Sequence, residues 1–224
     1  MNVELLYHTP DPERAVATAA RLCYAPVGAA ELMETMSDEQ ITRVLTTILS
    51  SGHLSTLEHA SYTFAVDGIS RACSHQLVRH RLASFNQQSQ RYVTFKEEPD
   101  FVLPQSVVDA GAEEEFHQAV KDAFAAYDKM VKLGIPAEDA RYLLPNACET
   151  KIVITMNIRE LLHFFSLRCC NRAQWEIREM ACRMLELAKP TAPFIFKDGG
   201  PGCARGACPE GKMCCGQPWE KVTR

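Results

Sequence analysis

The densest group of basic and polar residues in the chain is Arg79-His80-Arg81-Leu82-Ala83-Ser84-Phe85-Asn86-Gln87-Gln88-Ser89-Gln90-Arg91. Its first three residues close a stretch with helical apolar spacing, and successive helical side chains point about 100° apart, so these three face different directions. Guanidinium groups form bidentate bonds to phosphate, while Ser and Gln supply neutral hydrogen bonds to a ring edge. The segment therefore suits a phosphorylated heterocycle, and a solvated basic helix end is an equal alternative.

Strand-like and helix-like stretches flank this segment. Two of the upstream helices have cap signals, because Pro12 follows Asp11, and Ser37 with Gln40 forms a capping box ahead of Gly52. On this side the sequence predicts two strands and three helices: strands at residues 3–9 and 61–66, and helices at residues 11–23, 37–52 and 69–81.

Residues 84–86 read as a break, and the polar run after them is predicted to be a loop. Farther along, the sequence predicts a strand and four helices: a strand at residues 151–156, helices at 112–133 and 136–144, and two helices starting at the cap pairs Asn157 with Glu160 and Asn171 with Gln174. The last two helices should meet near residues 168–171. Because strands and helices do not alternate regularly, we expect an α+β fold, with an antiparallel sheet packed against helices.

Composition and charge narrow the class of protein. Of 224 residues, 46% are hydrophobic and 23% charged, so general disorder and fibrous architectures are excluded. The net charge of −4 argues against nucleic acid as a partner. No apolar run approaches the roughly 20 residues that span a bilayer, and the N-terminus lacks a signal pattern, so we expect a cytoplasmic protein with no membrane partner. Neither GxGxxG after a strand nor GxxxxGK[ST] occurs, so side chains must bind any phosphate.

The segment 79–91 fits Arg-His-Arg-x-x-Ser-x-Asn-x-x-Ser-x-Arg at every specified position, and by this signature the chain resembles the flavin-dependent thymidylate synthases. The resemblance extends to residues 52–59 upstream, and to residues 140–145 and 157–177 downstream. It covers roughly residues 1–196, which we expect to form the catalytic domain. A tail at residues 197–224, rich in Cys, Gly and Pro, lies outside it.

The resemblance implies an enzyme that makes dTMP from dUMP, taking a methylene group from 5,10-methylenetetrahydrofolate and a hydride from FAD reduced by NADPH. It implies a homotetramer whose active sites combine residues from several subunits. It implies dUMP contacts for Gln76, Leu77, Val78, Arg79, Gln87, Gln88, Ser89, Gln90, Arg91, Arg141 and Arg168. It implies FAD contacts for His53, Ser55, Arg79, His80, Arg81, Gln87, Asn157, Ile158, Arg159 and His163.

Arg168 matches the arginine to which the family assigns activation of uracil. A guanidinium beside uracil N3 and its carbonyl stabilises the deprotonated or enolate-like ring that forms as C5 becomes nucleophilic. Three positions depart from forms seen in the family, since His163, Arg172 and Gln87 stand where Asn, His and Glu can occur. Each keeps a hydrogen-bonding side chain, so flavin and nucleotide contacts are still expected.

The ten cysteines are expected to be thiols or metal ligands rather than a disulfide framework. Cys169 and Cys170 follow Arg168 and could supply a nucleophile, but burial at a helix contact is the favoured interpretation, and the resemblance places no nucleophilic Cys there. Cys203, Cys208, Cys214 and Cys215 lack the pair spacing of zinc ribbons. Metal ligation and flexible free thiols both remain open for them, and no metal is assigned.

Two hypotheses from different classes remain. The first is an α+β flavoenzyme that methylates dUMP, in which FAD delivers the hydride and no protein nucleophile has to attack the ring. The second is a metal-stabilised nucleic-acid-binding module that uses residues 79–91 for backbone contacts and the tail as its metal site. The acidic net charge and the lack of interleaved basic and aromatic residues disfavour the second.

Overall fold

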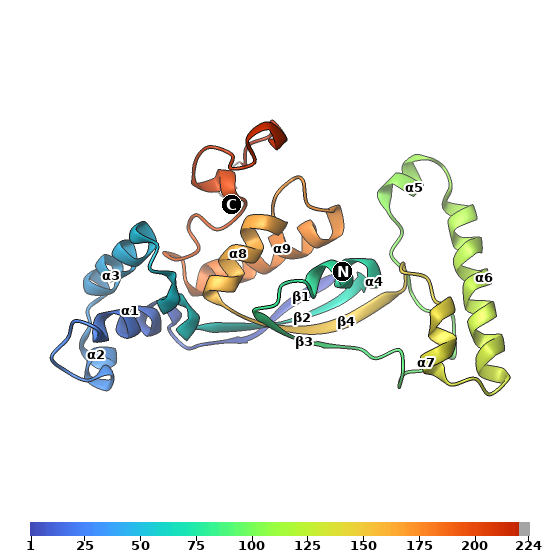
Figure 1. Ribbon diagram of the computed structural model, residues 1–224, viewed down its shortest axis with the longest axis horizontal. Helices are drawn as coiled ribbons and strands as arrows, with labels where there is room; N and C mark the ends of the chain where they lie inside the picture. The colour runs from blue at the N-terminus through green and yellow to red at the C-terminus, as the bar shows by residue number, and fades with distance from the viewer. Residues whose placement is uncertain (220–224) are drawn as a thin grey trace. The chain divides into compact units, whose positions relative to one another are not determined.

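The computed structural model describes residues 1–219, and within them four strands form one antiparallel sheet in the order β1-β2-β4-β3 (Figure 1). The strands are β1 (Asn2–His8), β2 (Ser61–Ser70), β4 (Glu149–Asn157) and β3 (Ala83–Gln87). Most of the other regular elements are helices, so the fold is α+β, as the sequence predicts.

The described chain forms two compact units, each assembled from separate segments. The first unit comprises residues 1–2, 66–79 and 85–153. The second comprises residues 3–65, 80–84 and the described residues from 154 onward. Strands β2 and β4 each run from one unit into the other. The segment 79–91 is also shared, with residues 80–84 in the second unit and the remainder in the first.

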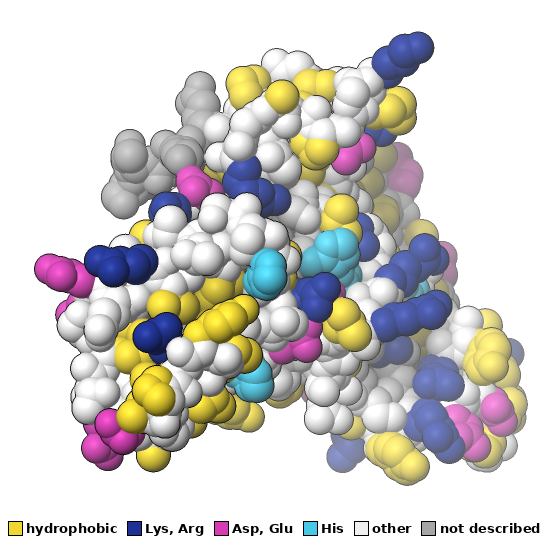
Figure 2. All heavy atoms as spheres, turned by 60° about the vertical axis from the view of Figure 1, so that its left-hand side comes forward, with side chains coloured by type: hydrophobic (Ala, Val, Ile, Leu, Met, Phe, Trp, Pro, Cys, Tyr) yellow, Lys and Arg dark blue, Asp and Glu magenta, His cyan; other side chains and the backbone are white. Residues whose placement is uncertain are grey.

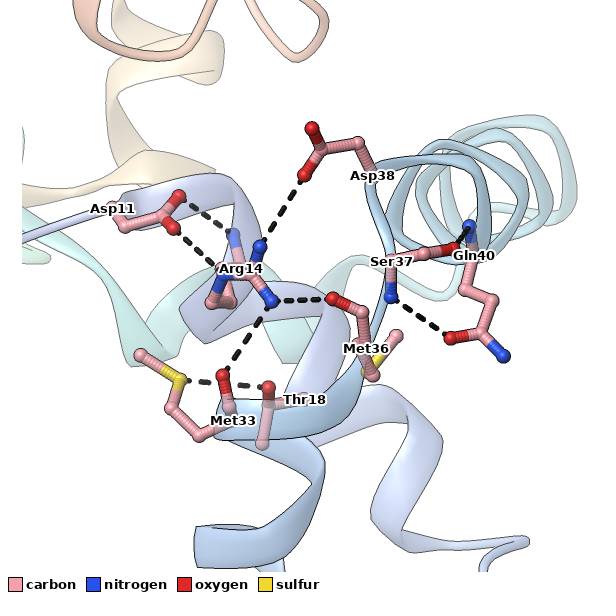
Figure 3. Close-up of polar contacts among 8 residues, drawn as sticks. All are labelled: Asp11, Arg14, Thr18, Met33, Met36, Ser37, Asp38 and Gln40. Atoms are coloured by element: carbon pink, nitrogen blue, oxygen red, sulfur yellow. Dashed lines mark hydrogen bonds and ion pairs between the residues drawn. The ribbon is translucent and has the colours of Figure 1, made fainter.

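Three helices of the second unit follow β1: α1 (Pro12–Leu22), α2 (Ala29–Thr35) and α3 (Asp38–Ser51). Arg14 of α1 connects all three, as Figure 3 shows. Its Nε donates to Asp11 at 2.9 Å, and its terminal nitrogens donate to the Met36 carbonyl at 2.6 Å and to Asp38 at 3.3 Å. One guanidinium therefore ties the start of α1 to the end of α2 and the start of α3.

Both predicted caps of these helices are present. The Asp11 side chain accepts the Arg14 N–H, and Ser37 and Gln40 form the reciprocal capping box (Figure 3). At the other end of α3, Gly52 has φ +74°, a left-handed conformation that favours glycine and ends the helix.

The later helices of the second unit are α8 (Ile158–Arg168) and α9 (Trp175–Ala188), which pack against each other (Figure 1). Fully buried aromatic rings form part of the core here. The ring centroid of Phe196 lies 5.7 Å from that of Tyr62 in β2 and 6.1 Å from that of Phe165 in α8. Burying one such side chain contributes about 1.5–3 kcal/mol. This core fixes α8, which carries several of the predicted site residues.

The first unit contains α4 (Arg71–Leu77), α5 (Gln105–Asp109), α6 (Glu113–Lys132) and α7 (Ala137–Ala140), with α7 lying beside α6 (Figure 1). Helix α6 has acidic residues in its first turn and lysines in its last, which oppose the helix dipole at both ends. The remaining short elements are 3-10 helices: η1 (Leu54–His59), η2 (Arg141–Leu143), η3 (Lys189–Thr191), η4 (Gly202–Arg205) and η5 (Gly211–Met213). In the described residues no helix is both long and apolar enough to cross a membrane.

Three local predictions are wrong. Residues 84–86 belong to strand β3 rather than a break, because pairing with β4 outweighs the weak strand preference of Ser84 and Asn86. The helix expected at 69–81 is only α4, because β2 continues to Ser70, whose side chain caps α4 by accepting the Cys73 N–H.

The N-terminal cap of α9 is Gln174 and not Asn171. The Gln174 side chain accepts the N–H groups of Glu176 and Ile177, while the Asn171 carbonyl oxygen accepts a hydrogen bond from Arg178. The sequence pattern also missed α2 and α5, which are short helices without a side-chain cap.

Candidate active site

The predicted site residues divide between the two units. The first unit holds Gln76, Leu77, Val78, Arg79, Gln87, Gln88, Ser89, Gln90, Arg91 and Arg141. The second unit holds His53, Ser55, His80, Arg81, Asn157, Ile158, Arg159, His163 and Arg168. The side chains of Leu77 and Ile158 are fully buried, so only their backbone atoms can reach a ligand.

Three side chains of the second unit form a hydrogen-bonded chain. His80 Nδ1 lies 3.0 Å from Oε1 of Glu160, and Arg168 Nε donates to His80 Nε2 over 3.0 Å. Glu160 lies in the first turn of α8 and Arg168 ends that helix, so the imidazole bridges the two ends of one helix. The predicted catalytic arginine is therefore held by the histidine of the segment 79–91.

The centre of this chain is buried, since the side chains of His80 and Glu160 are only 4% and 5% exposed. Burial lowers the pKa of His80 below its ordinary value, and the charge of Arg168 lowers it further. The hydrogen bond to Glu160 opposes this shift without cancelling it. The lowered pKa favours the neutral imidazole, which is the form that can accept the hydrogen bond from Arg168 at Nε2.

The other predicted residues of the second unit are polar groups with more solvent around them. His53, Ser55, Arg81, Arg159 and His163 are all exposed, and Figure 2 shows histidine side chains open on the face drawn there. Arg159 forms an ion pair with Glu58, and the Asn157 side chain caps α8 by accepting the Glu160 N–H at 2.9 Å. Exposed guanidinium, imidazole and hydroxyl groups fit a phosphate-containing cofactor that is bound without a glycine-rich loop.

In the first unit Glu138 brings two of the predicted arginines together. Its carboxylate accepts hydrogen bonds from Arg91 Nε at 2.8 Å and from a terminal nitrogen of Arg91 at 2.7 Å. Its backbone carbonyl accepts one from Arg141 Nε at 3.0 Å. Gln87 is held separately, by donating to the Thr150 hydroxyl at 3.1 Å. The paired arginines offer a cationic site that suits an anion such as phosphate.

Cys169 does not have the environment of a nucleophile. Its side chain is fully buried, and a hydrogen bond with the Cys182 thiol together with burial raises the pKa of Cys169 well above its ordinary value. The reactive form of cysteine is the thiolate, which this environment disfavours. The favoured interpretation from the sequence, a packing role at a helix contact, agrees with this placement.

The tail packs onto the residues that follow α8. Arg172 donates to the Met213 carbonyl at 2.6 Å, and the Asn171 amide donates to the Gln217 side chain at 3.3 Å. Throughout residues 1–219 all ten cysteines are free thiols, and no three His, Cys, Asp or Glu side chains are placed to hold one metal ion.

The sequence patterns did not identify two carboxylates of the candidate site. Glu160 contacts His80, the partner of Arg168, and Glu138 contacts Arg91. The sequence pattern identifies Glu160 only as a cap partner for Asn157, and Glu138 only as part of a short helix. The spacing of α8 holds a usable signal, because residues 160, 164 and 168 follow one another by four and share a helix face. Nothing in the sequence connects Glu138 with Arg91, which are 47 residues apart.

Comparison with known proteins places the chain among named relatives. The sequence model of the family described as "Thymidylate synthase complementing protein" matches residues 4–194. A protein of Geobacter sulfurreducens named flavin-dependent thymidylate synthase is 59% identical over 98% of this chain and 96% of its own length. Proteins with the same name from Clostridium tetani and Pyrococcus furiosus are 46% and 42% identical, over 98% and 99% of this chain and 95% and 98% of theirs.

Proposed function

The chain belongs to the flavin-dependent thymidylate synthase family, and on that premise we propose how its residues divide the work of the reaction. The enzyme is a methyltransferase that converts dUMP to dTMP, with 5,10-methylenetetrahydrofolate as carbon donor and FAD, reduced by NADPH, as hydride source. The observation that carries the proposed roles is the hydrogen bond that anchors Arg168 on His80.

Arg168 is the proposed catalytic residue. As C5 of the uracil ring becomes nucleophilic, negative charge develops on N3 and the adjoining carbonyl oxygen, and a guanidinium beside them stabilises it. A donor held in place before the substrate arrives needs no reorganisation during the reaction. The anchored geometry of Arg168 supports this role, and the protonated, buried thiol of Cys169 supports a route without a protein nucleophile.

The nucleotide is proposed to bind mainly to the first unit. Arg91 and Arg141 would contact the phosphate, and the amide and hydroxyl groups of the stretch 87–90 would meet the ring and the sugar. Backbone and side-chain atoms of residues 76–79 complete the proposed dUMP contacts. Support comes from the placement of both arginines on Glu138, which leaves the Arg91 side chain 51% exposed and open to exchange its partner for an anion.

FAD is proposed to bind through the exposed polar groups described above. Arg79 and Arg81, which flank the buried His80, would meet its pyrophosphate. Residues 53–55, Gln87, residues 157–159 and His163 would meet the remainder. The exposure of Arg79 and Arg81 supports this proposal, because cations that are not buried in the core can approach a charged ligand.

We further propose that the enzyme is a homotetramer with shared active sites, working in the cytoplasm, and that the tail at 197–224 lies outside the catalytic domain. The end of the family match at residue 194 supports the last point.

The proposed assembly is tested by the mass of the protein in solution, which should equal four subunits. His53→Ala and Arg81→Ala subunits, each impaired alone, should recover part of the activity when co-expressed, because some sites then receive both intact residues. An active monomer would contradict shared sites.

The activity is tested by dTMP formation. Purified protein loaded with FAD should convert dUMP to dTMP only when NADPH and methylenetetrahydrofolate are both present. Wild-type protein that binds FAD but yields no dTMP, or that forms dTMP without flavin, would contradict the proposed division of roles.

A further inference from the structure

We propose that Glu160 is a positioning residue for the reaction, because it fixes the ring of His80, and His80 in turn fixes the guanidinium of Arg168. This inference rests on the proposed catalytic role of Arg168. It concerns a carboxylate buried in the protein, which we do not expect to touch any substrate. Its basis is the direction of the two hydrogen bonds in the chain.

The first bond determines the tautomer of His80. Arginine stays protonated in proteins and its nitrogens only donate, so His80 Nε2 must accept the hydrogen bond from Arg168 Nε. In a neutral imidazole the proton then lies on Nδ1. That N–H points at Glu160 Oε1, 3.0 Å away, and an ionised carboxylate can only accept. Each member of the chain therefore has one permitted role.

Residues of one helix face surround the imidazole of His80. Glu160, Phe164 and Arg168 are spaced by four along α8, and all three contact His80, with the Phe164 ring edge-on at 4.9 Å between centroids. The backbone of Glu160 is itself bonded to the Asn157 cap. A carboxylate in the first turn of a helix is also favoured by the helix dipole. The imidazole is thus held from one side by a single helix face.

Without the negative charge of Glu160, the proton of His80 would no longer be fixed on Nδ1. The amide of a glutamine at this position can donate as well as accept, so the His80 proton could move to Nε2. Nε2–H and the Arg168 Nε–H would then face each other as two donors, and the guanidinium would lose its hydrogen bond to His80. A single wrong tautomer next to a catalytic group lowers turnover strongly even when the fold is intact.

The charged groups around His80 predict how turnover should depend on pH if Glu160 has this role. Glu160, His163 and Arg168 face it from α8, and Arg79 and Arg81 flank it in its own segment. Protonation of His80 would break its bond to Arg168, so turnover should fall on the acid side as His80 titrates. Glu160 raises the pKa of His80, so without its charge the acid limb should move to lower pH.

The test compares Glu160→Gln with wild type. Relative to wild type, kcat should fall roughly 10- to 100-fold, with KM for dUMP within about threefold and FAD content unchanged. The acid limb of kcat should shift to lower pH. The matched control is Glu13→Gln, in the first turn of α1, whose carboxylate oxygen accepts the N–H groups of Phe194 and Ile195. This control should keep both the wild-type kcat and the wild-type pH profile.

A second measurement does not depend on activity. Nitrogen-15 NMR of histidine-labelled wild-type protein should show the His80 proton on Nδ1, and Glu160→Gln should lose this preference. A His80 proton on Nε2 in wild type, or a wild-type kcat and pH profile in folded Glu160→Gln, would overturn the proposal. If wild-type protein forms no dTMP, the proposed function fails, while the tautomer experiment still decides whether Glu160 orients His80.

Discussion

The arginines of the two units are held in opposite ways. Arg168 donates to a buried imidazole, and the chain ends on a carboxylate whose side chain is 5% exposed. Arg91 instead pairs with Glu138 where both side chains are about half exposed. Solvent and salt screen an exposed pair strongly and a buried one little, so the exposed pair is weak and exchanges readily. This contrast fits the roles proposed for the two arginines, in which Arg168 is held in place before the transition state forms and Arg91 exchanges its partner for a ligand.

The largest effect should come from the buried side of this comparison. Arg168→Ala should lower single-turnover dTMP formation by roughly 10²- to 10³-fold, the scale for removing one charge-stabilising donor. FAD content should be retained, because the buried core of α8 is untouched. Arg168→Lys should not restore the rate, since an ammonium cannot keep the planar Nε–H bond to His80. A wild-type rate in either variant would remove Arg168 from the mechanism.

Substitution of the exposed Arg91 should change KM for dUMP rather than kcat. Arg91→Ala removes a charge-assisted bond to the nucleotide, so KM for dUMP should rise roughly 10- to 100-fold while kcat at saturation changes little. Steady-state kinetics over a range of dUMP concentrations would measure both. Glu138→Gln is the matched control and should change KM by less than about threefold, because it removes only a weak exposed pair. A loss of kcat in Arg91→Ala as large as the loss of rate in Arg168→Ala would contradict the proposed difference between the two arginines.

A smaller effect is expected at the buried thiol beside Arg168. Cys169→Ala should keep dTMP formation within about tenfold of wild type, because the thiol fills space and its environment disfavours the thiolate. Any loss should appear as a lower melting temperature rather than a lower single-turnover rate. Mass spectrometry of the reacting wild-type enzyme should show no nucleotide adduct on this sulfur. Abolished turnover in folded Cys169→Ala would restore the covalent route.

The smallest effect should come from the tail. Replacing Cys203, Cys208, Cys214 and Cys215 together by Ser should leave the single-turnover rate within about twofold, because none of these thiols is among the proposed catalytic or binding residues. The described part of the tail contacts Asn171 and Arg172 in the turn after α8. Elemental analysis of the wild-type protein accompanies the rate measurement. Stoichiometric zinc or iron, with a loss of stability in the variant, would show that the thiols ligate a metal.

The sequence correctly predicts those features of the fold that depend on residues close together in the chain. The caps at Asp11 and Ser37 and the end of α3 at Gly52 follow from short-range rules, and each is present. Strand β3 did not follow, because its hydrogen bonds come from β4, more than 60 residues away. Glu160 and Glu138 were missed for the same reason, since their partners are distant in sequence. The resemblance predicts catalytic and binding residues, but identifying Glu160 beside His80 and Glu138 beside Arg91 required the fold.

The most direct test of the central claim is the visible spectrum of the purified protein under anaerobic conditions. Protein loaded with FAD should show flavin absorbance of one FAD per subunit, and this absorbance should bleach when NADPH is added. It should return when dUMP and methylenetetrahydrofolate are then supplied, with one dTMP formed per flavin. Colourless protein that takes up no FAD in a titration, or a reduced flavin that the two substrates do not reoxidise, would contradict the account.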